Sequence, residues 1–420
     1  MTATPFKRIS VIGLGYIGLP TAAMFASRKI EVIGVDVNMR AVETINRGQI
    51  HIVEPDLDMV VHAAVSEGYL RATTIPEPAE AFLIAVPTPF KGPNHDPDLS
   101  YIEAASKSIA PVLVPGNLVI LESTSPVGAT EAMSAWLAEA RPDLSFPQTS
   151  GDGSDIRIAH CPERVLPGKV MQELITNDRV IGGMTRRCSE IAADLYRAFV
   201  TGDCVISTGP RVAEMAKLTE NSFRDVNIAF ANELSVICGR LDMDVWELIA
   251  LANRHPRVNI LQPGPGVGGH CIAVDPWFIV ASAPDEARLI ATAREVNDAK
   301  PGWVLDKVRA AIGAHLMEKP GRTAREVTVA IYGLAFKPDI DDLRESPALD
   351  IARRIAAEHA GPLQIIEPNV TALPEGLGAG TLVPLEEVRA EVHVMLVDHK
   401  PFKTTPRPEG RIVDARGVWG

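Results

Sequence analysis

The sequence has few cysteines, no excess of positive charge and no long uninterrupted hydrophobic run. Its five cysteines among 420 residues are scattered without CxxC spacing, so neither a zinc site nor a disulfide framework is indicated. We therefore predict no metal site and a reducing compartment. The formal net charge of -12 argues against nucleic acid binding, which depends on neutralising phosphates, although a local basic pocket can still hold a diphosphate.

A secretion signal and a membrane span are also not recognisable. The apolar stretch 9–26 is interrupted by three glycines and Pro20, and no small-residue cleavage pattern follows it. A nucleotide-binding turn explains this stretch better than an export signal. We therefore expect a cytoplasmic protein with no membrane partner.

Short β-branched runs alternate with helical patterns in the first third of the chain. The expected buried strands are residues 9–13, 31–36, 81–86 and 118–122. Helix-compatible stretches lie between them, at 17–27, 39–47 and 101–110. This alternation predicts an α/β fold with a doubly wound, largely parallel sheet.

A long helical pattern, roughly residues 211–240, follows this region and predicts a helix that joins domains and forms part of a dimer interface. A glycine- and proline-rich loop then runs from 262 to 276. The β–α pattern resumes at Val327, with strands expected at 327–333, 363–366, 392–397 and 411–413 and a helix at 346–358. We therefore predict two Rossmann-like doubly wound domains, 1–205 and 321–420, joined by a central helical dimerisation domain, 206–320.

A dinucleotide-binding motif lies between the first predicted strand and helix. Gly13 permits a tight turn, Gly15 lets the backbone approach a pyrophosphate, and Gly18 lets helix and strand pack closely. Asp36 closes the next strand, where a carboxylate binds both ribose hydroxyls and repels a 2′-phosphate. We therefore predict NAD rather than NADP as the cofactor. The basic Arg40 weakens this prediction only slightly, because it lies past the strand on the following helix.

The loop PGPGVGGHCIAVDPWF places Cys271 among glycines that bring the backbone close to a ligand. Most cysteines are inert buried side chains, and we predict this for Cys188, Cys204 and Cys238. Cys271 is instead a candidate nucleophile, which requires a lowered pKa or a nearby base.

The long helix carries a candidate polar partner for this cysteine. Lys217 and Asn221 are four residues apart and share one face, and Arg224 follows three residues later. For a lone lysine, a solvated charged helix face is the alternative.

The chain resembles the UDP-glucose/GDP-mannose dehydrogenase family, which includes the UDP-N-acetylmannosamine dehydrogenases, over essentially its whole length. The matching stretches are VIGLGYIGLP, VPTP, ESTSPVG, CPERVLPG, KLTENSFRD, NRHPRVN, PGPGVGGHC and GLAFKPDIDDLRES. Together they are highly specific, although no single stretch is. The resemblance implies an N-terminal NAD domain, a helical dimerising middle and a C-terminal domain that helps bind UDP.

The resemblance also implies a mechanism. Lys217 and Asn221 polarise the C6 oxygen of a UDP-sugar during a first oxidation to the aldehyde, to which Cys271 then adds. The resulting thiohemiacetal is oxidised to a thioester, and a buried ammonium stabilises developing oxyanion character. The residues expected to assist thioester hydrolysis are Asp275, Thr124 and Glu163. Each of the two acids could instead be a helix cap or a loop hydrogen-bonder.

The same resemblance assigns binding roles. The implied cofactor-binding residues are Gly13, Gly15, Tyr16, Ile17, Gly18, Asp36, Arg40, Thr88, Thr124 and Arg344. The implied substrate-binding residues are Arg164, Val165, Lys217, Asn221, Arg224, His255, Arg257, Gly268 and Lys337, with Lys337 meeting the diphosphate. Arg344 could instead pair with Asp341 or Asp342.

The cysteine loop favours one branch of the family. The glucose branch has serine before the cysteine and lysine before the aspartate, whereas His270 and Val274 stand here. The loop resembles the N-acetylmannosamine branch, which implies oxidation of UDP-N-acetyl-D-mannosamine to its uronate for surface polysaccharides such as enterobacterial common antigen or capsule. UDP-N-acetylglucosamine and UDP-glucose are the alternative substrates.

Two other classes of protein remain alternatives. A dehydrogenase of the 6-phosphogluconate type shares a dinucleotide domain followed by a helical dimerising domain, but it needs neither a catalytic cysteine nor an α/β domain after Val327. A non-catalytic NAD or nucleotide-sugar sensor has no need for Lys217, Asn221 and Cys271 together.

Overall fold

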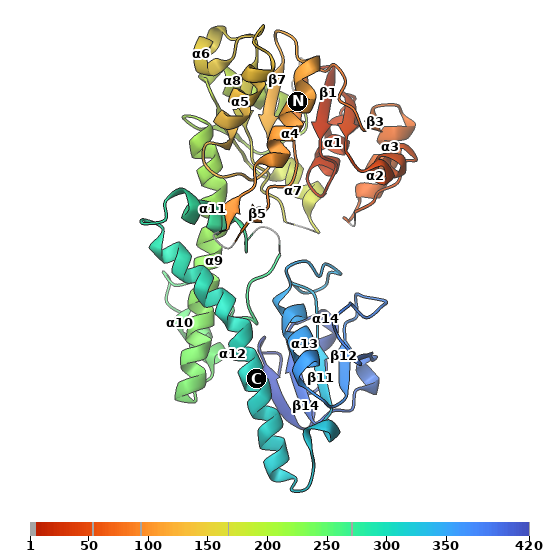
Figure 1. Cartoon of the computed structure of the whole chain (residues 1–420), viewed down its shortest axis with the longest axis vertical. Helices are drawn as coiled ribbons and strands as arrows, with labels where there is room; N and C mark the ends of the chain where they lie inside the picture. The colour runs from red at the N-terminus through yellow and green to blue at the C-terminus, as the bar shows by residue number, and fades with distance from the viewer. Residues whose placement is uncertain (1–5, 53, 93–94, 167, 270–271, 420) are drawn as a thin grey trace. The chain divides into compact units, whose positions relative to one another are not determined.

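The computed structural model describes residues 6–52, 54–92, 95–166, 168–269 and 272–419 (Figure 1). The chain forms two compact units, Met1–Glu220 with Ala281–Ala283 and Asn221–Val280 with Pro284–Gly420. Helix α9 (Pro210–Leu241) begins in the first unit and continues into the second. Pro210 is its first residue, where the missing proline N–H leaves no intrahelical bond unmade.

The first unit is built on an eight-stranded sheet with the order β10-β9-β8-β7-β4-β1-β2-β3. Its strands are β1 (Arg8–Ile12), β2 (Glu31–Val35), β3 (Leu70–Thr73), β4 (Ala81–Ile84), β7 (Leu118–Leu121), β8 (Arg157–His160), β9 (Arg179–Gly183) and β10 (Cys204–Ile206). Strands β3-β2-β1-β4-β7-β8 are parallel in the strand order of dinucleotide-binding sheets, and β9 joins β8 antiparallel. A short hairpin, β5 (Phe90–Lys91) with β6 (Asp96–Pro97), follows β4.

Helices connect these strands and cover the sheet. They are α1 (Gly18–Ser27), α2 (Met39–Asn46), α3 (Leu57–Ser66), α4 (Ser100–Ile109), α5 (Ala129–Ala140), α6 (Pro147–Ser150), α7 (Val170–Thr176) and α8 (Arg186–Tyr196). A residue remote in sequence caps the start of α5: the buried Glu214 of α9 accepts hydrogen bonds from the amides of Gly128 (2.7 Å) and Thr130 (2.8 Å).

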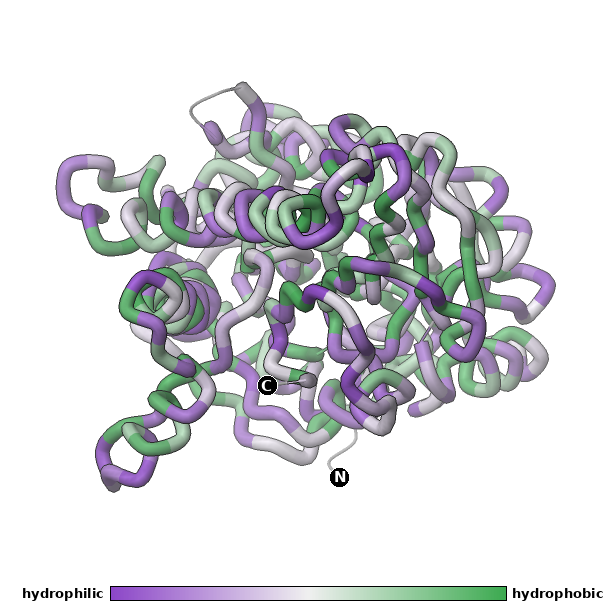
Figure 2. Tube along the Cα trace, turned by 90° about the horizontal axis from the view of Figure 1, so that it is seen from below, coloured by the Kyte–Doolittle hydropathy of each residue, from purple (hydrophilic) through white to green (hydrophobic). Residues whose placement is uncertain are grey.

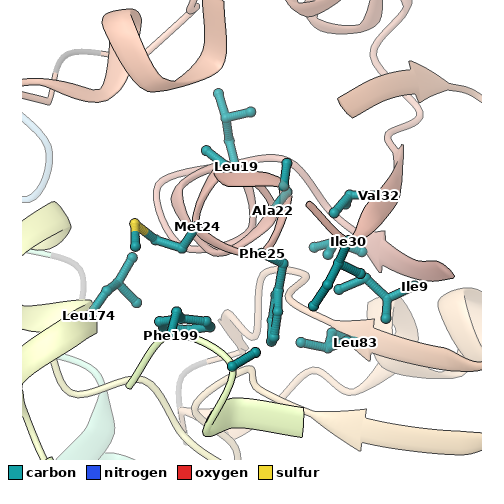
Figure 3. Close-up of a cluster of buried hydrophobic side chains, with 14 of the residues drawn as sticks. Ile9, Leu19, Ala22, Met24, Phe25, Ile30, Val32, Leu83, Leu174 and Phe199 are labelled. Atoms are coloured by element: carbon teal, nitrogen blue, oxygen red, sulfur yellow. The ribbon is translucent and has the colours of Figure 1, made fainter. Parts of the chain in front are cut away.

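Helix α1 anchors the core of the first unit. Figure 3 shows Phe25 directed toward the strand residues Ile9 and Leu83, and Met24 directed toward Leu174 and Phe199. These side chains are at most 5% exposed. Full burial of such a side chain contributes about 1.5–3 kcal/mol, and this packing fixes the helix that starts at the glycine turn.

The second unit contains a five-stranded parallel sheet with the order β13-β12-β11-β14-β15. Its strands are β11 (Val329–Tyr332), β12 (Leu363–Ile366), β13 (Thr381–Leu382), β14 (Val392–Met395) and β15 (Arg411–Asp414). The remaining helices are α10 (Val245–Ala252), α11 (Asp275–Ser282), α12 (Arg288–Glu318), α13 (Pro347–Glu358) and α14 (Lys400–Lys403). The order is the same as β3-β2-β1-β4-β7 in the first unit.

Two long helices of the second unit are tied together by buried polar groups. Asp225 of α9 accepts bonds from Arg294 (2.7 Å) and Asn297 (2.9 Å) of α12, and Asn232 donates to Asn297 Oδ1 (2.8 Å). Lys300 donates to the Ser235 hydroxyl, and burial lowers the pKa of this lysine to about 7. A buried network of this kind specifies one register between the two helices.

No described helix combines the length and the hydrophobicity needed to cross a membrane. Figure 2 shows hydrophilic and hydrophobic residues alternating along the traces of the helices.

The architecture confirms the predicted fold class: a Rossmann-like N-terminal sheet, a helical middle with long helices and a C-terminal parallel sheet. Each predicted strand and helix exists, with ends shifted by at most two residues. The division into three domains at residues 205 and 320 stays a prediction.

Candidate active site

The predicted cofactor residues gather at the carboxyl edge of the first sheet. Gly13, Asp36, Thr88 and Thr124 follow strands β1, β2, β4 and β7. The Thr88 hydroxyl donates to the Thr124 carbonyl oxygen (2.5 Å), which joins two of these strand ends. In such sheets ligands bind where the strand order reverses, here between β1 and β4.

The three glycines of the turn meet different surroundings. Gly13 has a φ of +92°, and a Cβ there would lie 2.5 Å from the Ala85 carbonyl oxygen. A Cβ on Gly18 would lie 1.8 Å from the Gly13 carbonyl oxygen. A Cβ on Gly15, by contrast, would have no atom within 4 Å. The protein itself therefore requires glycine at 13 and 18, whereas the space beside position 15 is open, which suits the close approach of a pyrophosphate.

Asp36 is fixed by backbone amides. Its carboxylate accepts the Leu14 amide (2.9 Å) at one oxygen and the Asn38 amide (2.8 Å) at the other. Each oxygen keeps a second lone pair for a ribose hydroxyl, so these residues fit a dinucleotide. Asn38 also caps α2, on which Arg40 is exposed, and Tyr16 and Ile17 lie between Gly15 and α1.

Glu163 is held in the loop that follows β8. It is 6% exposed, its Oε2 pairs with Arg179 Nη1 (2.5 Å), and its Oε1 accepts the Arg164 amide (2.7 Å). Both oxygens are thus engaged in fixing the loop, so a role in activating water requires that one bond be exchanged. Arg164 pairs with Glu220 of α9 (2.7 Å), and Val165 next to it is half-buried.

Arg179 and Glu122 are residues that the sequence reasoning missed. Glu122 follows β7, accepts the Tyr196 hydroxyl at Oε1 (2.6 Å) and is fully buried. Burial raises the pKa of Glu122 to about 7, against the opposing charge of Arg179. A charged residue directly after an apolar strand was the available signal for Glu122, whereas nothing in the sequence marks Arg179 as the partner of Glu163.

Helix α9 and the start of α11 bring two predicted catalytic residues together. Asn221 donates its amide to Asp275 Oδ2 (2.5 Å), and Asp275 is buried as the first residue of α11. A carboxylate there is stabilised by the amide end of the helix. Lys217 is half-buried one turn before Asn221 on α9, and Arg224 is exposed.

The glycine-rich loop packs against the C-terminal α/β region within the second unit. A Cβ on Gly268 would lie 2.3 Å from the Glu345 carbonyl oxygen, and one on Gly269 would lie 3.0 Å from the Phe336 ring. The loop therefore runs beside the segment that carries Lys337, which is half-buried. Cys271 and His270 lie outside the described residues.

The remaining predicted binding residues are more exposed. Arg344 forms a two-pronged ion pair with Asp342 (2.6 and 2.9 Å), one of the two partners considered from the sequence. His255 and Arg257 lie on an exposed loop after α10.

Three other cysteines were predicted to be inert. Cys188 and Cys238 are buried, and Cys204 is half-buried. Burial raises the pKa of the Cys204 thiol, which disfavours the reactive thiolate.

The doubly wound sheet, the glycine turn and the acid at the end of β2 are the features of the NAD-binding domains found in NAD-dependent dehydrogenases. The chain belongs to the UDP-glucose/GDP-mannose dehydrogenase family, whose NAD binding domain matches residues 7–200, central domain residues 211–299 and UDP binding domain residues 330–420. The first match confirms NAD as the predicted cofactor.

Three similar proteins are informative. The UDP-N-acetyl-D-mannosamine dehydrogenase of Yersinia pestis is 66% identical, and the alignment covers 99% of each chain. The NDP-N-acetyl-D-galactosaminuronic acid dehydrogenase of Ralstonia nicotianae is 62% identical over 99% of this chain and 96% of its own. The solved UDP-D-ManNAc dehydrogenase of Pyrococcus horikoshii is 38% identical, with a TM-score of 0.86 over 98% of this chain and 96% of its own.

The open surroundings of Gly15 lead to a first prediction. Gly15→Ala should leave the melting temperature nearly unchanged, because its Cβ meets no protein atom. It should raise the KM for NAD by at least about tenfold, because the methyl group lies where the pyrophosphate approaches. Gly18→Ala is the matched control and should lower the melting temperature. A Gly15→Ala enzyme with an unchanged KM for NAD would contradict the proposed position of the cofactor.

The buried Glu122 leads to a prediction about pH. The pKa of Glu122 is raised from 4.5 to about 7 in the folded state. Between these pH values the folded protein keeps a proton on Glu122 that the unfolded protein releases. The free energy of unfolding therefore falls as the pH rises through this range. Glu122→Gln should therefore stabilise the protein at pH 8 by on the order of 2 kcal/mol and have little effect at pH 4.5. Urea unfolding at both pH values measures this. The exposed Glu139→Gln is the control, and an equal effect of Glu122→Gln at both pH values would refute the argument.

Proposed function

We propose that this protein is an NAD-dependent dehydrogenase that oxidises C6 of UDP-N-acetyl-D-mannosamine twice, from the alcohol to the carboxylate. The observation that supports this most strongly is the 66% full-length identity to a UDP-N-acetyl-D-mannosamine dehydrogenase. The glycine turn supports the cofactor part of this proposal, and the Asn221–Asp275 hydrogen bond separately supports a shared role for these two residues.

In the first oxidation, Lys217 and Asn221 polarise the C6 oxygen. They are one helical turn apart on α9, so a single oxygen atom can meet both side chains. The glycine turn would hold NAD, which would supply the hydride acceptor for both oxidations, while the hydroxyl proton released in each oxidation would pass to water. The ammonium of Lys217 stabilises negative charge that develops on the oxygen.

Cys271 makes the second oxidation possible. Its thiolate adds to the aldehyde carbon and forms a thiohemiacetal, which still carries a hydrogen on C6 and can lose a second hydride. The product is a thioester, and water attacks its carbonyl carbon to release the carboxylate and the thiol. The residues that we assign to this hydrolysis are Asp275, Thr124 and Glu163.

The other predicted residues bind the two ligands. Lys337 meets the diphosphate of the nucleotide sugar, and Arg344 reaches the cofactor by exchanging its bond with Asp342. The remaining substrate contacts that we assign are Arg164, Val165, Arg224, His255, Arg257 and Gly268. Guanidinium groups suit phosphates because of their two-pronged geometry.

The choice of sugar rests on the cysteine loop and on the similar proteins. His270 and Val274 replace the serine and lysine of the glucose branch, and Val274 is buried directly before Asp275. The N-acetyl group offers an amide donor, a carbonyl acceptor and a methyl group that a site can recognise. The 62% identity to an NDP-N-acetyl-D-galactosaminuronic acid dehydrogenase makes N-acetylgalactosamine, which differs from N-acetylmannosamine at C2 and C4, a sugar to test beside N-acetylglucosamine, the C2 epimer. We assign the product to surface polysaccharide synthesis in the cytoplasm.

The substrate proposal predicts two NADH per molecule of UDP-N-acetyl-D-mannosamine. UDP-glucose should react at least about tenfold more slowly, equivalent to roughly 1.4 kcal/mol, because polar groups built to meet the N-acetyl group are left unpaired. Absorbance of NADH, with each UDP-sugar as the limiting reagent, measures rate and yield together. The panel contains the N-acetylmannosamine, N-acetylglucosamine, N-acetylgalactosamine and glucose nucleotides. One NADH per sugar would remove the reason for Cys271, whereas a faster rate with UDP-glucose would overturn only the sugar.

We also propose that the helical middle forms a homodimer through α9. Phe223, Phe230 and Ile237 are 70%, 52% and 42% exposed and are spaced by seven residues, so they form one stripe along the helix. Leu241 extends the stripe and is 59% exposed. A contiguous exposed apolar surface marks an interaction site, and a second copy of the helix offers the same apolar stripe.

Phe230→Glu should shift the protein from dimer toward monomer, because a symmetric interface places the new charge against an apolar surface twice. Light scattering coupled to size exclusion measures the mass. Met59→Glu is the control, since Met59 is 64% exposed on α3, away from the stripe. A Phe230→Glu variant that stays dimeric would place the interface elsewhere.

A further inference from the structure

The C-terminal sheet repeats the cofactor turn of the first sheet, bond for bond. In the first sheet, Gly13 donates to the Val35 carbonyl oxygen (2.7 Å), and the Leu14 amide donates to Asp36 (2.9 Å). In the second sheet, the Gly333 amide donates to the Ile366 carbonyl oxygen (2.9 Å), and the Leu334 amide donates to Glu367 (2.7 Å).

Three further correspondences extend the match. Asn38 and Asn369 lie two residues after their acids and donate backbone amides to them (2.8 and 3.0 Å). The strand registers align β1, β2 and β4 with β11, β12 and β14. By this register Glu367 corresponds to Asp36, and His399 corresponds to Thr88, four residues past the end of its strand.

Glu367 differs from Asp36 in one respect: its carboxylate is buried and bonds to other groups of the protein. Its side chain is fully buried, and Oε2 accepts the Leu334 amide and the ring Nε2–H of His399 (3.1 Å). Burial alone would raise the pKa of Glu367, but hydrogen bonds from His399 and Leu334 lower it, so the carboxylate stays ionised. A buried, fully engaged acid has no lone pair to offer a ribose.

The bonds of His399 define its tautomer. Its Nδ1 accepts the Asp339 backbone amide (2.9 Å) and the side-chain amide of Asn369 (3.1 Å). A ring nitrogen that accepts two N–H groups carries no proton, so the proton is on Nε2, which donates to Glu367.

This pair fixes both ends of one short loop. Glu367 holds the amides of Leu334 (2.7 Å) and Ala335 (3.2 Å) at the beginning of the loop, and His399 holds Asp339 at its end. Lys337 lies in the middle of these six residues. Asp339 has a φ of +62°, and its carboxylate accepts the Lys400 amide (2.9 Å), which fixes the end of the loop a second time.

We propose that Glu367 and His399 are the positioning residues of the diphosphate-binding loop, because Glu367 holds the amides at its beginning and His399 holds the Asp339 amide at its end. Glu367 corresponds to Asp36, the acid that we assign to the ribose in the cofactor domain. In the C-terminal sheet this acid instead holds the loop that presents Lys337 to the diphosphate of the nucleotide sugar. This inference rests on the proposed role of Lys337 in the function above.

Two substitutions of His399 separate the bond made by its Nε2 from the bonds accepted by its Nδ1. Gln places its Nε2 near the ring Nε2 and keeps the bond to Glu367, but it loses the acceptor for the Asp339 amide. Asn places its Oδ1 near the ring Nδ1 and keeps that acceptor. His399→Gln should weaken binding of UDP, measured by calorimetry, on the order of tenfold, with kcat at saturating sugar and the KM for NAD within about twofold. His399→Asn should bind UDP nearly as the unchanged protein does.

His393→Gln is the matched control. His393 is also buried in the C-terminal sheet, but its Nε2 bonds to the Ala390 and Glu409 carbonyl oxygens, which precede β14 and β15 at the opposite edge, and its Nδ1 bonds to the Tyr332 hydroxyl (2.9 Å) rather than to the loop 334–339. This variant should lose stability without losing affinity for UDP. Weaker UDP binding by His393→Gln, or by a folded His399→Asn, would show that general packing is responsible and would overturn the proposal, even if His399→Gln does not fold.

A double-mutant cycle distinguishes the two levels of the argument. Lys337→Met alone should weaken UDP binding, and adding His399→Gln to it should cost little more, because His399 acts through Lys337. Additive losses would overturn the positioning role. If Lys337→Met does not weaken UDP binding, the proposed role of Lys337 fails. If it does while His399→Gln has no effect, the positioning inference alone fails.

Discussion

The functional part of each sheet depends on one interaction: a carboxylate at the end of one strand accepts the backbone amide that follows a glycine at the end of its neighbour. Asp36 does this for Leu14, and Glu367 does it for Leu334. The bond fixes the turn at the carboxyl edge of the sheet, where loops from adjacent strands converge. The first turn leaves Gly15 and the second lone pairs of Asp36 open for a ligand, whereas in the second turn the oxygens of Glu367 are taken by backbone amides and by His399.

Much of this arrangement could be predicted from the sequence because its determinants are local. The glycine spacing, Asp36 at the end of a β-branched run and the apolar period of α9 are all visible within short windows. The C-terminal domain was predicted to be a second Rossmann-like domain, but the hydrogen bonds that the two turns share were not predicted. The sequence hides this match because no second glycine follows Gly333 at the spacing of Gly15, and because a glutamate stands in place of Asp36. No range was predicted for helix α12, which continues through Pro301 although proline usually breaks a helix.

The missed residues act through partners remote in sequence. Arg179, the first residue of β9, forms an ion pair with Glu163, which follows β8, and Glu122 accepts a hydrogen bond from Tyr196 of α8. Neither pairing has a spacing that a single sequence reveals, because it depends on strand order and burial. The same holds for Asn221 and Asp275, which share a bond 54 residues apart. The family resemblance assigned them to one reaction, and the fold brings them together by placing α11 against α9.

The central claim is that the second oxidation proceeds through a covalent bond to Cys271. The most direct measurement is peptide mass spectrometry of a variant with slowed thioester hydrolysis, such as Asp275→Asn, after incubation with NAD and UDP-N-acetyl-D-mannosamine. The account predicts an adduct on the Cys271 peptide with the mass of the sugar nucleotide less the hydrogens removed by two oxidations, and none in a further Cys271→Ser variant. Near-normal turnover by Cys271→Ser, with no adduct on the cysteine peptide, would contradict it.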